Sequence, residues 1–435
     1  MAIITRQRQI FEWKELEILG DLERFRLVTE HMPDERLMQR LESKRDRGRD
    51  DYPVRAMWNS ILAGVIYQHP SIESLIRELS RNSQLRRICG FAEDKVPSSW
   101  AYSRFLANLF SHEELIKEIF EGLVKQCYEL LPGFGRHLAL DGKAIDSLAR
   151  RENKNKKADR RRDLDADTGV KSYKGQREDG TLWEKVTYWF GYELHLLVDS
   201  DYELPVAFEL TPASHSEVKQ AHRLIGSLDA ERPEVLEACE YFTADRGYDD
   251  GKLNSSLFDD HGIKPVIDTR NLWRDGEKTR LFDGRDNIVY DYRGTVYCCC
   301  PKELKLKEMA YGGFEKGRNT LKYRCPAEHY GLKCKGKEHC PVTGSIRVSI
   351  FEDRRIFTPL PRSSYKWRDC YKKRTAVERV NSRLDVSFGF EQHYIRGQKK
   401  MHFRCSLALC IMLAMAVGRV KEKRPDLIRS LVKTA

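Results

Sequence analysis

The segment between residues 136 and 267 constrains the fold of this chain most, because strand-type and helix-type patterns alternate along it. Residues 136–145 form a short strand-like run. Residues 186–199 and 203–210 are rich in aromatic and β-branched residues on either side of a polar turn, which predicts a β-hairpin. The pattern continues with a helix at 215–228, a strand at 241–244, a helix at 251–260 and a strand at 265–267. This order predicts a mixed α/β fold, in which helices cover a mixed sheet.

Two aspartates occupy unusual places in this segment. Asp141 lies inside the strand-like run LALDGK, where a buried carboxylate is costly unless it is paired or binds a metal ion. Asp245 directly follows the strand-like YFTA. If the fold gathers these carboxylates, their mutual repulsion requires cations, and ligands that are all oxygen select Mg²⁺ or Mn²⁺ over zinc. Spacing alone leaves other acids as alternatives: Asp146, Asp199, Asp249 and Asp250.

A third carboxylate lies in residues 371–385, YKKRTAVERVNSRLD, which have the length and pattern of one helix. The spacing of Tyr371, Arg374 and Glu378 places a phenol, a guanidinium and a carboxylate on one helical face. Such a face suits a phosphodiester and a metal ion. A solvated helix with an internal ion pair between Arg374 and Glu378 is the alternative interpretation.

Together, these motifs resemble those of a known family. LALDGK around Asp141, FTADRGY around Asp245 and the Y-x2-R-x3-E spacing that ends at Glu378 are similar to the bacterial insertion-sequence transposases with an RNase H-like DDE core. GYELHLLVD and LPVAFELTPAS also resemble the second and third strands of that family. The resemblance extends over about residues 50–420, and it implies an RNase H-like catalytic core.

The resemblance implies a reaction and its partners. Asp141, Asp245 and Glu378 would bind two Mg²⁺ or Mn²⁺ ions and catalyse hydrolysis at the transposon ends, followed by joining of the freed 3′-hydroxyl to target DNA. Tyr371 and Arg374 would contact the DNA backbone near the cleaved end. The implied partners are the terminal inverted repeats, the target DNA and a second copy of the chain, which together form a synaptic complex.

One position departs from the family's signature. The family has a lysine seven residues after the glutamate, and this chain has Asp385, an acid that would repel a phosphate. Two alternatives to an active transposase therefore stay open. One is a transposase-derived DNA-binding protein without catalysis, and the other is an RNase H-like DNA nuclease that cuts without joining.

Residues 270–360 interrupt the α/β pattern and predict a cysteine-rich insertion into the core. The candidate zinc ligands are Cys300, Cys325, Cys334 and Cys340, because four thiolates form a tetrahedral site. No C-x2-C pair is present, and there are several alternates: Cys298, Cys299, His329 and His339. Reduced, buried cysteines that bind no metal are the other interpretation.

Trp273 lies early in the insertion. Tryptophans carried by such insertions stack on a flipped base in some relatives, and we treat Trp273 as a candidate for that contact with DNA. An ordinary core or surface tryptophan is the alternative.

The rest of the chain completes a four-part organisation. Residues 1–130 carry apolar side chains at helical spacing and predict an all-helical N-terminal domain that is a candidate for DNA contact. Residues 131–269 are expected to form the first part of the core, 270–360 the insertion, and 361–435 the C-terminal helices of the core. The apolar run at 405–417 is shorter than the roughly 20 residues that span a membrane, so we expect a buried helix and no membrane contact.

Charge and cysteine usage indicate the surroundings of the protein. Lys and Arg number 77 against 66 Asp and Glu, a net charge of +11 that fits a polyanionic partner. Residues 150–162 contain eight Lys or Arg, so this stretch is either a solvated loop or a segment that binds phosphates, with Arg160, Arg161 and Arg162 as candidate DNA contacts. No apolar signal-peptide core is present near residue 1, so we expect reduced thiols and a cytoplasmic protein. The family resemblance implies a bacterial, nucleoid-associated one.

Overall fold

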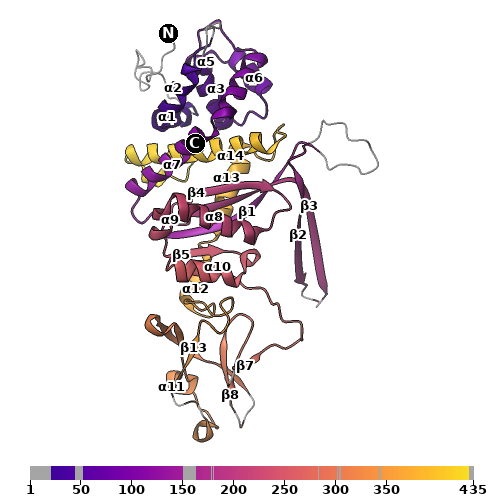
Figure 1. The fold of residues 1–435 in the computed structure, drawn as a ribbon, viewed down its shortest axis with the longest axis vertical. Coiled ribbons are helices and arrows are strands. Elements are labelled where there is room, and N and C mark those ends of the chain that lie inside the picture. Colours follow the sequence, from indigo (N-terminus) through magenta and orange to yellow (C-terminus); the bar gives the residue numbers. More distant parts are fainter. Residues whose placement is uncertain are drawn as a thin grey trace.

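The computed structural model describes residues 21–44, 52–149, 163–177, 179, 181–282, 284–300, 302, 305–340, 342 and 344–430. Figure 1 shows an elongated molecule, with N-terminal helices at one end, a mixed sheet in the middle and the insertion at the other end. The long helix α14 (Gln398–Lys421) lies between the N-terminal helices and the sheet.

The N-terminal helices pack around the apolar helix α3, and the helical prediction for this region is confirmed where the structure describes it. The helices are α1 (Leu22–His31), α2 (Glu35–Ser43), α3 (Val54–Ile66), α4 (Ile72–Arg81), α5 (Ser83–Cys89), α6 (Ser99–Leu109) and α7 (Glu113–Leu130). Buried Asp34 accepts hydrogen bonds from Arg55 (2.5 Å) and from the indole of Trp58 (2.6 Å). This paired acid fixes the loop before α2 onto α3, because an unpaired carboxylate would be costly there.

The central sheet contains parallel and antiparallel strands, as predicted. Its strands are β1 (His137–Asp146), β3 (Leu182–Asp199), β4 (Leu204–Pro212), β5 (Tyr241–Ala244) and β6 (Lys264–Ile267), paired in the order β4-β3-β1-β5-β6. Strand β3 is antiparallel to β1 and β4, whereas β1, β5 and β6 run parallel. Every residue of β5 and β6 is buried except half-buried Lys264, and these short strands therefore carry mostly apolar side chains.

A two-stranded arm projects from this sheet (Figure 1). Strand β2 (Asp167–Gln176) pairs with the first half of β3, from Asp167↔Gly191 to Gln176↔Leu182. The sequence predicted no strand at 167–176 and a first hairpin strand that begins only at residue 186, which is wrong, because β2 occupies 167–176 and β3 begins at Leu182. The reason is that the β-branched and aromatic first half of β3 offers a ladder for this polar strand. The basic run with Arg160, Arg161 and Arg162 lies outside the described residues.

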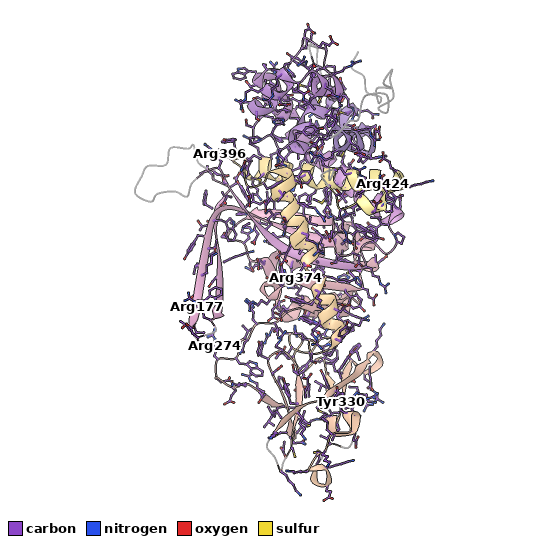
Figure 2. All side chains as sticks on the ribbon, turned by 180° about the vertical axis from the view of Figure 1, so that it is seen from behind. Arg177, Arg274, Tyr330, Arg374, Arg396 and Arg424 are labelled. Carbon is purple, nitrogen blue, oxygen red and sulfur yellow. The ribbon has the colours of Figure 1, made fainter. Side chains whose placement is uncertain are left out.

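Helices cover both faces of the sheet. Figure 1 shows α8 (Glu217–Glu231), α9 (Pro233–Ala238) and α10 (Gly251–Ser255) on one face. Figure 2, from behind, shows α12 (Tyr365–Lys372) and α13 (Thr375–Phe388) on the other. The predicted single helix over 371–385 is therefore two helices. The amides of Lys373 and Arg374 bond three residues back, to Cys370 and Tyr371, and this tighter turn ends α12.

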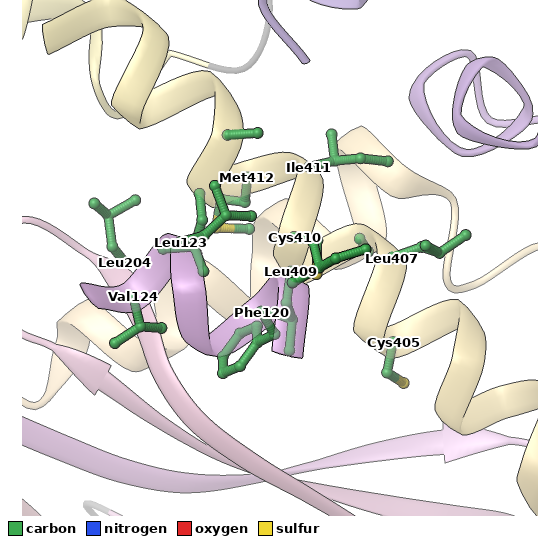
Figure 3. Packing of buried hydrophobic residues seen from close by; sticks show 14 of the residues in the cluster. Phe120, Leu123, Val124, Leu204, Cys405, Leu407, Leu409, Cys410, Ile411 and Met412 are labelled. Carbon is green, nitrogen blue, oxygen red and sulfur yellow. The ribbon is translucent and has the colours of Figure 1, made fainter. Parts of the chain in front are cut away.

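Helix α14 is the central core helix, in agreement with its apolar sequence. Figure 3 shows its side chains packed against Phe120, Leu123 and Val124 of α7 and against Leu204 of β4. Its length and composition would suffice to cross a membrane, but 83% of its most apolar 18-residue window is buried inside the protein. The burial identifies it as the core of a folded domain rather than as a free apolar segment.

The insertion folds as two small sheets between β6 and α12. One contains β7 (Arg280–Phe282), β8 (Arg285–Tyr290), β9 (Val296–Cys299) and β10 (Leu306–Glu308), and the other β11 (Ala310–Glu315), β12 (Thr320–Arg324) and β13 (Ser345–Ser349). They share a separate apolar core. Buried Arg362 ties the end of the insertion to the sheet, because its guanidinium donates to the carbonyls of Ile267 (2.9 Å), Ile356 (2.9 Å) and Arg355 (3.0 Å).

Leu409 in α14 is fully buried, so truncating it tests the role of this helix. We expect Leu409→Ala to lower the free energy of unfolding by about 2 to 5 kcal/mol, through lost burial and a residual cavity. Leu164→Ala is the matched control, because Leu164 is 84% exposed and its loss should change stability by less than about 0.5 kcal/mol. Urea denaturation followed by circular dichroism measures both, and equal effects would contradict the core role of α14.

Candidate active site

The sheet places Asp141 and Asp245 side by side. Strands β1 and β5 are parallel neighbours whose last paired residues are Leu140 and Ala244, so the two aspartates are the next residues on adjacent strands. Asp245 ends its strand and accepts a hydrogen bond from the amide of Gly247 (2.7 Å), which starts the short turn η2 (Arg246–Tyr248). The backbone positions of both aspartates are thus set by the pairing of β1 with β5 and by the turn that follows β5.

The surroundings of both aspartates disfavour their negative charge. Burial raises the pKa of Asp141 to about 6, and the neighbouring charge of Asp245 adds to this. Burial, followed by the charge of Glu217, raises the pKa of Asp245. The cations of Lys171 and Arg374 oppose both shifts without cancelling them. Because the negative charges outweigh those of the two cations, the site favours the binding of a further cation.

Lys171 reaches into the site from the arm. Its ammonium lies 3.1 Å from Glu193 and 3.0 Å from Glu217, and donates a hydrogen bond to the carbonyl of Gly142 (3.2 Å). Glu193 is only 2% exposed, and burial raises its pKa to about 7 although Lys171 opposes the shift. Lys171 therefore neutralises part of the charge of an acidic group. This group contains Glu193 and Glu217 in addition to the predicted aspartates.

Two glycines allow these carboxylates to crowd together. A Cβ atom on Gly142 would lie 2.6 Å from a carboxylate oxygen of Glu193 and 3.3 Å from one of Glu217. A Cβ atom on Gly247 would lie 2.4 Å from Glu217 and 2.8 Å from Asp245. Glu217 thus lies against both backbone segments that carry the aspartates, in space that only glycine leaves open.

Tyr248 lies beneath this group. Its side chain is fully buried, and its hydroxyl finds no hydrogen-bond partner among the described residues. Burial first, and then the charges of Glu217, Asp141, Glu193 and Asp245, raise its pKa well above the ordinary value. A buried hydroxyl in this position is available to donate to a carboxylate or to a ligand that enters the site.

The third predicted carboxylate lies on the other side of the aspartates. The guanidinium of Arg374 binds Glu378 (2.6 Å) and interacts electrostatically with Asp141 and Asp245. The side chain of Glu378 is 48% exposed. Tyr371 stacks on Trp367 with ring centroids 4.6 Å apart, and Arg374 lies 5.8 Å from its ring. Arg374 is therefore the residue that links the predicted motifs.

The carboxylates of this site are not arranged as a complete set of metal ligands. In the described part of the chain, no three His, Cys, Asp or Glu side chains have the geometry to hold an ion. The internal pair between Arg374 and Glu378, which the sequence offered as the alternative for this helix, is present. The role of Glu378 as the third metal ligand stays a prediction.

The competing aspartates serve the fold. Buried Asp199 accepts hydrogen bonds from the amides of Gly135 (2.8 Å) and Tyr202 (2.6 Å). Asp249 binds Arg355 (2.9 Å) at the insertion. Asp250 caps α10 through the amide of Leu253 and pairs with His222, while Asp146 is exposed at the end of β1. These contacts distinguish the competitors from Asp141 and Asp245.

Comparison with known proteins agrees with the motifs. Residues 134–414 match the family model described as a transposase DDE domain, and residues 13–108 match a model described as a transposase domain. The chain belongs to the DDE transposase family. A solved piggyBac transposase synaptic complex with hairpin DNA shares 13% identity, with a TM-score of 0.39 over 95% of this chain and 80% of that chain. No curated protein matches this transposase.

The remaining predicted residues of the transposase lie in its insertion. Half-buried Trp273 packs edge-on against Tyr290 (ring centroids 5.9 Å apart), and the guanidinium of Arg280 lies 4.4 Å from its ring. These contacts agree with a tryptophan that packs within the insertion. The predicted zinc ligands line one small cavity: Cys300, Cys325, Cys334 and Cys340.

Sequence reasoning missed four residues of the candidate site: Lys171, Glu193, Glu217 and Tyr248. Glu193 carried a signal, because it is a charge inside an apolar strand, as Asp141 is. Tyr248 belongs to the same FTADRGY motif as Asp245. Lys171 and Glu217 gave no local signal, since each reaches the site from an element whose packing is set by distant residues.

The raised pKa of Asp141 predicts an effect of pH on stability. An unfolded aspartate has a pKa of about 3.9. Between about pH 4 and pH 6 the folded protein therefore binds more protons than the unfolded chain, and raising the pH lowers the free energy of unfolding. Without added Mg²⁺ or Mn²⁺, we expect Asp141→Asn to be more stable than wild type at pH 8, by on the order of 1 to 2 kcal/mol.

The difference should vanish at pH 4, where the wild-type carboxyl is protonated. Asp146→Asn is the matched control, since Asp146 is an exposed acid on the same strand and should show no such gain. Urea denaturation at both pH values measures the effect. A variant that is no more stable than wild type at pH 8 would contradict the assignment of Asp141 to an electrostatically strained site.

Proposed function

We propose that this transposase cuts DNA at the ends of a mobile element and joins the freed 3′-hydroxyl to target DNA. The observation that carries the proposal is the pair of aspartates at adjacent strand positions, inside an acidic group that the protein's own cations only partly neutralise. We also propose that the core is RNase H-like, which the strand order β4-β3-β1-β5-β6 with antiparallel β3 supports.

The charge of the site fits divalent cations. Lys171 and Arg374 face a larger number of carboxylates: Asp141, Asp245, Glu193, Glu217 and Glu378. Asp141 and Asp245 would hold two Mg²⁺ or Mn²⁺ ions, because hard cations prefer oxygen ligands. Bound there, such ions supply an activated water or hydroxyl and stabilise the leaving oxygen of an in-line displacement. The buried hydroxyl of Tyr248, which has no hydrogen-bond partner among the described residues, would donate to one of these carboxylates.

Arg374 couples DNA binding to the third carboxylate. A guanidinium binds a phosphate through two parallel hydrogen bonds, which are stronger than its contact with a half-exposed carboxylate. We propose that Arg374 moves from Glu378 to a DNA phosphate, with Tyr371 beside it, and that this releases Glu378 to complete the metal site. The turn between α12 and α13 allows the change, because Arg374 precedes the first residue of α13.

The arm of β2 and β3 is a second candidate for DNA contact. It exposes aromatic side chains, Trp183 at 39% and Tyr188 at 66%, close to exposed Lys185 and to Arg177 near the tip (Figure 2). Aromatic rings stack on bases and basic side chains bind phosphates, so this surface fits DNA. We also propose that two copies of the chain act together in a synaptic complex, in a cytoplasmic location where DNA is accessible.

The central prediction concerns Asp245. Wild-type protein with Mg²⁺ should nick DNA that carries the terminal inverted repeats of the element, and Asp245→Asn should lower the rate by more than about 100-fold, because a metal ligand is lost. DNA affinity in a gel-shift assay should be unchanged. Asp146→Asn, with its acid at the end of β1, should cleave normally.

Each outcome of this assay selects one function. If Asp245→Asn cuts as well as wild type, the proposal is wrong. Cutting without any joining of the 3′-hydroxyl would identify a nuclease. Salt-dependent binding without cleavage under any divalent ion would identify a DNA-binding protein that has lost catalysis.

A comparison of two glutamates identifies the third ligand. We expect Glu378→Gln to lower cleavage by more than about 100-fold and to weaken Mn²⁺ binding. Glu217→Gln should lower cleavage by about tenfold or less, since Glu217 mainly pairs with Lys171 (3.0 Å). Single-turnover cleavage and Mn²⁺ titration measure both variants. The reverse ranking would replace Glu378 by Glu217 in the metal site.

A further inference from the structure

The insertion contains an enclosed cavity whose lining is rich in sulfur. Its volume is about 20 Å³, enough for roughly one atom-sized guest. The cysteines of the lining are Cys298, Cys299, Cys300, Cys325, Cys334 and Cys340. The cavity lies in the insertion, separate from the carboxylates of the core. It therefore has no part in the site described above.

Four of these thiols converge from separate backbone segments. Cys298 lies on β9, and Cys325 caps the short helix α11 (Pro326–Tyr330). Cys334 and Cys340 flank the turn η5 (Lys337–His339). All four line the same cavity. A guest held by these four would connect the sheet of β9 to the segment that follows β12.

The lining also contains groups that favour thiolates. The side-chain amide of Asn287 donates a hydrogen bond to the sulfur of Cys340 (3.5 Å), and Asn287 is itself only 7% exposed. Lys307 adds positive charge to the same wall. Hydrogen-bond donors and cations around a thiolate stabilise its charge and are typical of the residues around metal ligands.

These cysteines differ from the others in the chain. Cys89, Cys127, Cys405 and Cys410 are buried in the main apolar core, where burial raises their pKa. They behave as small apolar side chains. The four converging thiols are only half-buried, and no disulfide joins any of the twelve cysteines, all of which the structure describes.

We propose that Cys298, Cys325, Cys334 and Cys340 bind one structural zinc ion. Four thiolates at about 2.3 Å from the metal form the closed tetrahedral site that structural zinc prefers. In this structure the sulfurs are farther apart than in a zinc site, since no described group of three or more ligands has metal-holding geometry. Cys334 and Cys340 lie outside regular strands and helices, so the loop around η5 is the part that would move when the four thiols close on an ion.

The proposal changes one ligand that the sequence predicted. Cys298 lies on β9 and is half-buried, as Cys325, Cys334 and Cys340 are, whereas Cys300 follows β9 and is only 4% exposed. His329 packs on Tyr330 (ring centroids 4.6 Å apart) and does not line the cavity. The side chain of His339 is not among those described. Zinc would add stability to an insertion whose own apolar core is small.

Metal analysis of the full-length protein, purified under reducing conditions, tests the proposal. We expect about one zinc per chain by mass spectrometry, and Co²⁺ exchange should give the thiolate-to-cobalt absorption of a tetrahedral site. Serine variants at each of the four cysteines should lose more than about nine-tenths of the zinc. Cys370→Ser is the control and should keep the zinc, because Cys370 lies on α12 and does not line the cavity.

A local measurement accompanies the metal analysis. Zinc removal should increase hydrogen exchange in residues 325–340 by at least about tenfold and leave β1 and β5 unchanged. Absence of zinc and of Co²⁺ binding, or a disulfide between these cysteines in native protein, would overturn the proposal. Loss of zinc in Cys300→Ser together with retention in Cys298→Ser would overturn the ligand assignment. No DNA is involved, so the result is independent of the proposed transposition activity.

Discussion

Repulsion between Asp141 and Asp245 follows directly from the register of the sheet, and most of the surrounding structure offsets it. Because β1 and β5 are parallel neighbours, their two acids cannot separate without breaking strand pairing. Lys171 approaches from the arm and Arg374 from the α12–α13 turn, and each cation is itself paired with a glutamate. The protein thus stabilises the metal-free site without fully neutralising it, and the remaining charge is what a divalent ion would compensate.

The chain leaves the sheet after β6, forms the insertion and rejoins the sheet at α12. Two arginines, Arg355 and Arg362, fix the point at which it rejoins. Arg362 donates to backbone carbonyls of β6 and of the insertion's last loop, while Arg355 binds Asp249 (2.9 Å). Breaking such buried contacts costs several kcal/mol, because each leaves unpaired polar groups. The insertion is therefore docked rigidly enough to position Arg374 near the aspartates, although more than a hundred residues separate them along the chain.

The local sequence pattern was enough to predict the two aspartates as candidates and to predict most strands. It failed for segments and side chains whose positions depend on long-range packing. Asp141 was identifiable because a charge interrupts an apolar strand, and Asp245 because it ends one. The polar segment of β2 gave no such pattern; it is a strand because β3 extends past the sheet to pair with it. Lys171 and Glu217 meet only in the folded chain, and Cys298 differs from Cys300 only in its burial within the folded insertion.

Asp385 was the position that fitted the family's signature least, and the structure supplies its partner. Lys143 lies two residues after Asp141 on β1, and its ammonium is 2.5 Å from the carboxylate of Asp385 on α13. Both side chains are largely buried, so the pair is weakly screened and holds α13 against β1. The acid is thereby neutralised and need not repel a phosphate. Because Lys143 is held in this pair, in the proposed reaction the contact with the DNA end would fall to Arg374 and Tyr371.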